Sequence, residues 1–195
     1  MIIGLSGNIA CGKSTAAAIF KEHGCSVVDC DVIARNLLQT DPQVIQQLTK
    51  HWGAGIILPD GSIDRMQVAS IVFKDSIELK WLEDLLHPKI HQIWKQQVAL
   101  KPDLNVHWVV EIQLLFEKKL EIDFDLSVCI TSSLDNQLTR LLDKSYSIQD
   151  AHSRMQCQMP LQEKMNQADI VITNDGSIDF LKKQIQLLIQ TINLN

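Results

Sequence analysis

Residues Ser6–Thr15 read SGNIACGKST and indicate the fold before any other part of the chain. They fit the pattern G-x-x-x-x-G-K-[ST] of phosphate-binding loops, with Gly7, Gly12, Lys13 and Ser14 at the defining positions. In such a loop backbone N–H groups point at the anion, and the dipole of the following helix adds attraction. The pattern therefore predicts a phosphate-binding site in the loop at residues 7–14.

The residues on either side of this loop supply the context that the pattern requires. Met1–Ser6 is a short apolar run typical of a buried strand, and residues 13–23 favour a helix that Gly24 ends. A strand, a glycine-containing loop and a helix in this order make a chance match rare. We therefore interpret the loop as a nucleotide site.

Three residues after the second loop glycine carry the expected contacts. Lys13 would reach the β- and γ-phosphates, the Ser14 hydroxyl would ligate Mg²⁺, and Thr15 would contact the α-phosphate. Gly12 would bring the backbone close to the phosphates. ATP and Mg²⁺ are thus the expected cofactors.

Asn8, Ala10 and Cys11 stand where glycine and other small residues are common in such loops. Asn tolerates left-handed conformations better than other non-glycine residues, whereas Ala10 requires a negative φ. We expect Cys11, close to a helix N-terminus, to have a lowered pKa or simply to fill the loop.

Strand-like and helix-like segments alternate along the whole chain. Strands are expected at residues 1–6, 25–31, 106–112, 126–130 and 169–174. Because these runs are apolar throughout and are separated by helices, they predict an α/β fold with about five parallel strands covered on both faces. Residues 42–100 are almost wholly helical, with helices starting near Pro42, Asp64 and Ser76, and resemble an insertion.

Composition narrows the class of protein and its compartment. The chain has 195 residues, 46% of them hydrophobic, and a net charge of −5, which argues against nucleic-acid binding. Its five cysteines include no C-x-x-C pair, and its apolar runs are shorter than the roughly 20 residues of a membrane helix. The start of the chain lacks the features of a signal peptide. We expect a single cytoplasmic domain that is a monomer or a weak homo-oligomer.

Other motifs limit the phosphoryl chemistry. The guanine-binding motif N-K-x-D is not matched by TNDGS, and no signature of a transport ATPase is evident. With GTPases and transport ATPases excluded, the remaining class is a compact kinase with a helical acceptor region and a basic lid.

Several further segments resemble the dephospho-coenzyme A kinase family across nearly the whole chain. They are VVDCDVIAR (27–35), DGSIDRMQVASIVF (60–73), WLEDLLHPKI (81–90), LLFE (114–117) and MPLQEKMNQADIVITNDGS (159–177). The resemblance implies a P-loop kinase that phosphorylates the ribose 3′-hydroxyl of dephospho-coenzyme A with ATP. It also implies an acceptor region at about 32–100 and a lid at about 140–165.

Asp31 is the expected general base. The attacking hydroxyl must lose its proton, and Asp29 and Asp31 lie at the C-terminal end of the second expected strand, beside the loop in this architecture. Asp29 would hold Mg²⁺ through water or orient the loop. The alternative for Asp31 is a helix N-cap, with Arg35 one turn later as a surface ion pair.

Two arginines are candidates for a lid over ATP. Arg140 follows the fourth expected strand, and Arg154 follows YSIQDAHS. Arginine stabilises the charge of a transferring phosphoryl group with planar donors, although a solvated helix face is the alternative for each. Asn174, after the last expected strand, is a candidate for adenine contact.

The acceptor candidates are more scattered. By resemblance they are Arg35, Arg65, His87 and Leu114, besides Asp31. His87 and His91 have a spacing compatible with a metal, but the sequence shows no third ligand, so we favour a helix start or acceptor contact at His87–Pro88. A surface role for Arg65 stays open.

Two positions depart from the family pattern. Glu111 stands where aspartate is usual, and Gln113 replaces a proline, which predicts a looser turn into Leu114. Two rival functions remain: a kinase of nucleoside monophosphates, and an ATP-binding sensor without catalysis.

Overall fold

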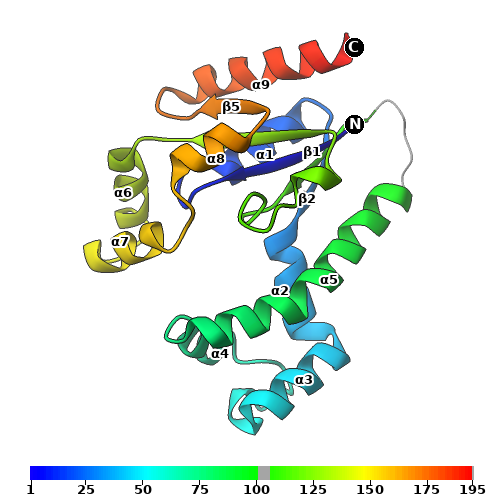
Figure 1. Ribbon diagram of the computed structural model, residues 1–195, viewed down its shortest axis with the longest axis vertical. Coiled ribbons are helices and arrows are strands. Elements are labelled where there is room, and N and C mark those ends of the chain that lie inside the picture. The colour runs from blue at the N-terminus through cyan, green and yellow to red at the C-terminus, as the bar shows by residue number, and fades with distance from the viewer. Residues whose placement is uncertain (101–105, 195) are drawn as a thin grey trace. The chain divides into compact units, whose positions relative to one another are not determined.

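The computed structural model describes residues 1–100 and 106–194, which form two compact units (Figure 1). The sheet unit comprises Met1–Val28 and Asp103–Asn195, and the helical unit comprises Asp29–Pro102.

The sheet unit is built on five strands in the order β2-β3-β1-β4-β5. Their bounds are β1 Ile2–Gly7, β2 Ser26–Asp29, β3 Trp108–Glu111, β4 Leu126–Thr131 and β5 Ile170–Thr173. β1 pairs in parallel with β3 and β4, and β4 pairs in parallel with β5. The expected α/β fold with a five-stranded sheet is therefore confirmed, and the phosphate-loop sequence begins at the end of its central strand.

Five α-helices of the sheet unit accompany these strands. They are α1 Lys13–Glu22, α6 Leu134–Leu142, α7 Ile148–Gln156, α8 Leu161–Gln167 and α9 Ile178–Asn193, with a short 3₁₀ helix, η2, at Glu121–Asp123. The side chain of Ser133 caps α6, and that of Ser147 caps α7. Helix α8 was not expected, because its seven residues are too few to show a clear periodicity.

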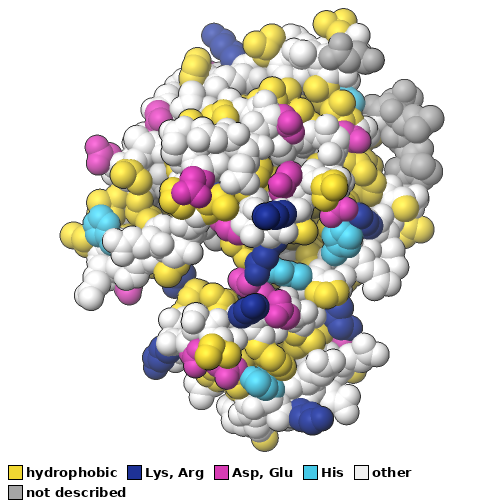
Figure 2. Space-filling model, in the orientation of Figure 1, with side chains coloured by type: hydrophobic (Ala, Val, Ile, Leu, Met, Phe, Trp, Pro, Cys, Tyr) yellow, Lys and Arg dark blue, Asp and Glu magenta, His cyan; other side chains and the backbone are white. Residues whose placement is uncertain are grey.

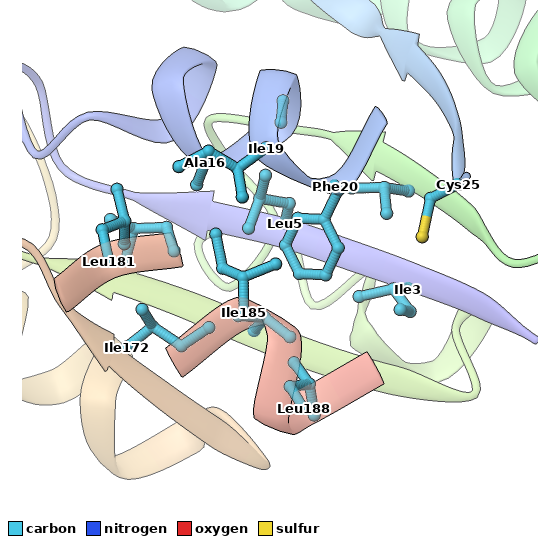
Figure 3. Packing of buried hydrophobic residues seen from close by; sticks show 14 of the residues in the cluster. Ile3, Leu5, Ala16, Ile19, Phe20, Cys25, Ile172, Leu181, Ile185 and Leu188 are labelled. Carbon is cyan, nitrogen blue, oxygen red and sulfur yellow. The ribbon is translucent and has the colours of Figure 1, made fainter. Parts of the chain in front are cut away.

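The core of the sheet unit joins β1 to two helices that are far apart in sequence. Ile3 and Leu5 of β1 pack among Phe20 of α1 and Ile185 of α9, and all four are almost completely buried (Figure 3). α8 contacts β4, and Figure 1 shows it in front of the sheet with α1 behind. Helices thus cover both faces, so that only the strand ends and their loops are available for chemistry.

The helical unit begins with Asp29, the last residue of β2. Its α-helices are α2 Cys30–Thr40, α3 Pro42–Trp52, α4 Arg65–Val72 and α5 Ser76–Leu100, with a 3₁₀ helix, η1, at Ala54–Ile56. The helix starts expected near Pro42, Asp64 and Ser76 are confirmed. The side chains of Asp29, Asp41 and Asp64 cap α2, α3 and α4.

The expectation that His87–Pro88 starts a helix is wrong. Both residues lie inside α5, the long helix from Ser76 to Leu100. Proline is usually excluded from helix interiors because it lacks an N–H group. Here the helix continues through it, so the sequence signal for a boundary was misleading.

Charges of both signs are distributed over the molecule. On the face drawn in Figure 2, acidic and basic side chains are interspersed. No helix within residues 1–100 and 106–194 is long and apolar enough to cross a membrane.

Candidate active site

The loop between β1 and α1 takes a shape that requires glycine at both ends. Gly7 has φ 147° and Gly12 has φ 93°, values that side chains disfavour. A Cβ on Gly7 would overlap the carbonyl oxygen of Ile130, and one on Gly12 would overlap the side-chain nitrogen of Asn174. The two glycines of the motif are thus explained by backbone conformation and by close approach.

Ala10 contradicts the expectation of a negative φ. Its φ is 60°, in the left-handed region, which costs a residue with a Cβ about 1–2 kcal/mol. The Cys11 N–H donates to the Asn8 carbonyl at 3.2 Å, which closes a tight turn around Ala10. The turn holds Ala10 in this conformation at the tip of the loop.

Lys13 and the two hydroxyl residues after it open α1. Lys13 Nζ donates to the carbonyl oxygens of Gly7 (3.0 Å) and Asn8 (3.4 Å), so its ammonium lies over the loop. Ser14 and Thr15 are exposed, and no side chain caps the helix at Gly12. An uncapped helix N-terminus beside an ammonium is suited to an anion.

Arg140 and Asn174 hold the outer side of the loop. Arg140, on α6, donates from one guanidinium nitrogen to the Ala10 carbonyl at 3.0 Å and to Ser132 Oγ at 3.1 Å. Its other terminal nitrogen donates to the Asn174 carbonyl at 2.7 Å. The Asn174 amide donates to the Cys11 carbonyl at 2.8 Å. In a trans peptide N–H and C=O point in opposite directions, so the Gly12 N–H faces away from Asn174.

The Asp175 carboxylate joins the turn before α6, the helix that carries Arg140, to the turn that contains Asn174. Its Oδ1 accepts hydrogen bonds from the Ser133 N–H (2.6 Å), the Ser132 hydroxyl (2.8 Å) and the Asn136 amide (2.9 Å). These donors, led by the Ser133 N–H, hold the pKa of the Asp175 carboxyl far below its usual range. The β4–α6 turn and the β5–α9 turn are thereby joined at the loop.

Cys11 fits the second of the two roles expected for it, that of a loop filler. Its side chain is fully buried, and burial raises its pKa, although Lys13 opposes the shift. Cys129, on β4, is also buried, and burial raises its pKa to about 12. The prediction of a lowered pKa at Cys11 is wrong because exclusion of water outweighs the helix terminus. Cys11 is a small loop filler.

The segment after α7 contacts the loop from its other side. Gln158 Oε1 accepts from the Ile9 N–H at 2.7 Å, and the Met159 carbonyl accepts from the Asn8 amide at 3.2 Å. Arg154 lies on α7 with its guanidinium 4.8 Å from the centre of the Tyr146 ring. The lid predicted from the sequence therefore includes residues that hydrogen-bond to the loop.

At the start of the helical unit, the capping role belongs to Asp29. Asp29 Oδ1 accepts from the N–H groups of Asp31 (2.8 Å) and Val32 (3.1 Å). Arg35 lies 4.0 Å from the Asp29 carboxylate, and its Nε donates to the Asp31 carbonyl at 3.1 Å. The alternative of Asp31 as the N-cap is wrong, and the Asp31 side chain is exposed in the first turn of α2.

The other acceptor candidates lie on different elements. Arg65 is the exposed first residue of α4, and His87 is half-buried inside α5. Leu114 belongs to the sheet unit, where it is half-buried in the turn after β3. Within the described parts of the chain, no group of three His, Cys, Asp or Glu residues could hold a metal ion, so His87 and His91 form no such centre.

The turn at Gln113 is better fixed than expected. The Gln113 carbonyl accepts from the Ser6 hydroxyl and from Lys164 Nζ, both at 3.2 Å. Glu111 ends β3 opposite Leu5 of β1. The predicted loosening at Gln113 is therefore offset by two side-chain hydrogen bonds.

Within the sheet unit the structure brings the loop, Arg140 and Asn174 together, but sequence reasoning missed several of their neighbours. These are Ser132, Gln158, Lys164 and Asp175. Each is a common polar residue without a local motif, and only the segment 159–177 drew attention to two of them. Apart from the contact between Ser132 and Arg140, the cited contacts join residues more than 40 positions apart, which periodicity cannot show.

Comparisons with known proteins agree on one family. The sequence model described as dephospho-CoA kinase matches residues 1–179. A dephospho-CoA kinase of Carboxydothermus hydrogenoformans is 36% identical over 191 residues, covering 97% of this chain and 93% of the relative.

Two solved structures are similar over nearly their whole length. A Thermus thermophilus protein has a TM-score of 0.83 and 28% identity, covering 98% of this chain and 97% of that chain. A dephospho-CoA kinase of Campylobacter jejuni has a TM-score of 0.73 and 26% identity, covering 98% and 96%.

Proposed function

The chain belongs to the dephospho-CoA kinase family and catalyses the ATP-dependent phosphorylation of dephospho-CoA that completes coenzyme A synthesis, and we propose that the loop Gly7–Ser14 and Asp31 carry this reaction. One observation supports the residue assignment most directly. The loop opens α1 with an uncapped helix end, and Lys13 lies over it. This is the arrangement that a triphosphate requires.

On the ATP side, the loop residues from Asn8 to Gly12 surround the phosphates with their backbone. Lys13 neutralises the β- and γ-phosphates, and Thr15 contacts the α-phosphate. Arg140 stabilises charge on the transferring group and orients Ala10 through its carbonyl. Arg154 contributes a second guanidinium from α7. Asn174 contacts adenine while its amide orders Cys11.

Asp31 is the proposed general base. Its carboxylate takes the proton of the ribose 3′-hydroxyl as that oxygen forms a bond to the γ-phosphorus. The bond from the γ-phosphorus to the β–γ bridging oxygen breaks, and ADP leaves with the electron pair. Because Asp29 caps α2, the first turn of that helix is stabilised without the Asp31 side chain.

The remaining acceptor contacts are assigned by charge and position. Arg35 and Arg65 are exposed cations suited to the anionic part of dephospho-CoA. His87 and Leu114 offer a hydrogen-bonding and an apolar surface. Arg35, Arg65 and His87 lie within residues of about 32–100, the proposed acceptor region, whereas Leu114 lies outside it. Residues of about 140–165 act as the lid.

Mg²⁺ fits the donors present. It usually keeps several waters and binds through one or two protein oxygens together with substrate phosphates, so a cluster of three protein ligands is not needed. The exposed Ser14 hydroxyl at the start of α1 is such an oxygen. When bound, the ion would neutralise negative charge on the phosphates. We also propose a cytoplasmic location and a monomer or weak homo-oligomer.

Product formation tests the assignment of substrate. ADP release is measured with ATP, Mg²⁺ and either dephospho-CoA, AMP, CMP or dTMP, and the product of the first is identified as coenzyme A. We expect turnover with dephospho-CoA alone. Turnover with a nucleoside monophosphate instead would identify a different kinase, and absence of ADP release with every acceptor would indicate an ATP-binding sensor.

Replacing Asp31 tests the base. We expect Asp31→Asn to lower kcat by about 10²–10⁴-fold, because the amide cannot take the hydroxyl proton, and to leave the Kd for ATP within about threefold. Asp84→Asn, the same exchange at an exposed position of α5, is the control and leaves kcat unchanged. Wild-type kcat in Asp31→Asn would remove Asp31 from the mechanism.

A further inference from the structure

Lys164 is a charged residue in the interior of the sheet unit, and the steps described so far do not use it. It lies on α8 with no exposed surface, and its Nζ is 2.6 Å from Glu117 Oε1. Glu117 Oε2 is also buried and accepts no hydrogen bond from the residues that the structure describes. A buried ion pair of this kind is a weak source of stability, since removing two charges from water is costly. Its presence therefore calls for another explanation.

The contacts of Lys164 lead to the start of the phosphate loop. In addition to its ion pair with Glu117, the Lys164 ammonium donates a hydrogen bond to the Gln113 carbonyl at 3.2 Å. That carbonyl also accepts from the hydroxyl of Ser6, which is fully buried and directly precedes Gly7. One carbonyl oxygen thus joins Lys164 to the residue at which the loop begins.

A second route to the loop runs along the chain before α8. Gln158 and Met159 hydrogen-bond to Ile9 and Asn8, and Pro160 then forms the N-cap position of α8. Because Lys164 anchors this short helix, its position also bears on these two contacts. Gly7, Asn8 and Ile9 are therefore held by two sets of contacts, one through Ser6 and one through the segment before α8. Both sets of contacts depend on Lys164.

The surroundings of Cys129 agree with this placement. Cys129 is the register partner of Ser6 on the neighbouring strand. Both Lys164 and Lys13 act to lower the pKa of its buried thiol, against the larger effect of burial. The two ammonium groups thus lie near one buried point below the loop.

We propose that Lys164 is a positioning residue of the kinase reaction, with its ammonium, neutralised by Glu117, holding the Gln113 carbonyl, Ser6 and the Gln158–Met159 segment so that the loop backbone is ordered for ATP. This role rests on the proposed function of the loop. It predicts that Lys164 governs kcat and loop order without contacting the nucleotide or the acceptor.

A pair of variants separates this role from stability. Lys164→Met alone leaves Glu117 buried without a partner and should lower Tm. Lys164→Met/Glu117→Leu removes both charges, and we expect its Tm to be close to that of the wild type. Its kcat should nevertheless fall by about tenfold or more, with the KM for dephospho-CoA within about threefold, because misplacement of a site by about 1 Å costs that much in rate.

Hydrogen exchange gives a readout that does not depend on activity. Amide exchange across Asn8–Cys11 should be faster in the double variant than in the wild type at equal Tm. Ser6→Ala, which removes the other donor to Gln113, should speed the same amides and lower kcat by a smaller factor. Lys182→Met/Glu22→Leu, which removes an exposed ion pair of the sheet unit, is the matched control and should leave kcat and exchange unchanged.

Wild-type kcat and wild-type loop exchange in the folded double variant would overturn the proposal, as would a Ser6→Ala protein that exchanges and turns over like the wild type. Failure of the proposed function looks different, since the wild-type protein itself would then not phosphorylate dephospho-CoA. Loop exchange would still report on Lys164 in that case.

Discussion

Ala10 occupies a backbone conformation that one substitution can test. Its left-handed φ of 60° costs about 1–2 kcal/mol, which glycine would recover, although glycine loses about 0.5–1 kcal/mol more in chain entropy. We expect Ala10→Gly to leave the free energy of unfolding in urea unchanged or to raise it by about 1 kcal/mol. Ala18→Gly, at an exposed position inside α1, should lower it by about 1 kcal/mol. Equal losses in the two variants would show that Ala10 is not strained.

At the residue scale, sequence reasoning succeeded where chemistry is local. Gly7, Gly12 and Lys13 could be placed because their roles depend on one strand–loop–helix unit. The raised pKa of Cys11 could not be predicted, because it depends on burial by residues distant in sequence. Asp31 was considered as the N-cap because the second strand was expected to extend to residue 31, whereas β2 ends at Asp29 and α2 begins at Cys30.

Among the elements, the turns after β4 and β5 depend on one carboxylate. Hydrogen bonds led by that of the Ser133 N–H lower the pKa of Asp175 in the folded protein. Below the unfolded pKa of about 4 the unfolded chain binds a proton that the native protein does not, so stability is lost as pH falls. We expect Asp175→Asn to reduce the free energy of unfolding at pH 7 by about 1–2 kcal/mol.

The pH dependence provides the check on this assignment. Denaturation at several values between about pH 5 and pH 2 should show a shallower loss of stability in Asp175→Asn than in the wild type. Asp143→Asn, at an exposed position just after α6, should keep the wild-type slope. A parallel slope in Asp175→Asn would exclude Asp175 as a source of the acid dependence.

Long helices with clear capping residues could be predicted more readily than short helices without them. Helix α1 and the starts of α3, α4 and α5 were predicted, since apolar spacing and capping residues can be recognised in consecutive residues. Helix α8 was missed because its one fully buried side chain is a lysine, which reverses the usual pattern. Pro88 suggested a boundary that α5 does not have.

For the molecule as a whole, nucleotide binding should appear as added stability. A ligand present at about 100 times its Kd contributes about 2.7 kcal/mol, which for a chain of this size raises Tm by roughly 5–10 °C. We expect a non-hydrolysable ATP analogue with Mg²⁺ to give such a shift in the wild type and less than half of it in Lys13→Met. Lys21→Met, at the exposed end of the same helix, should shift like the wild type. An undiminished shift in Lys13→Met would place the nucleotide elsewhere.

The position of β1 in the sheet has a consequence for biosynthesis. β1 is synthesised well before its partners β3 and β4, which begin only at Trp108 and Leu126. Strand pairings so distant in sequence form slowly, because the entropy cost of closing the intervening loop must be met before the pairing contributes stabilising contacts. The nascent chain must therefore carry β1 unpaired until β3 and β4 have been made, a period in which its apolar residues are exposed to chaperones. The ATP loop is thus translated long before the strands that position it.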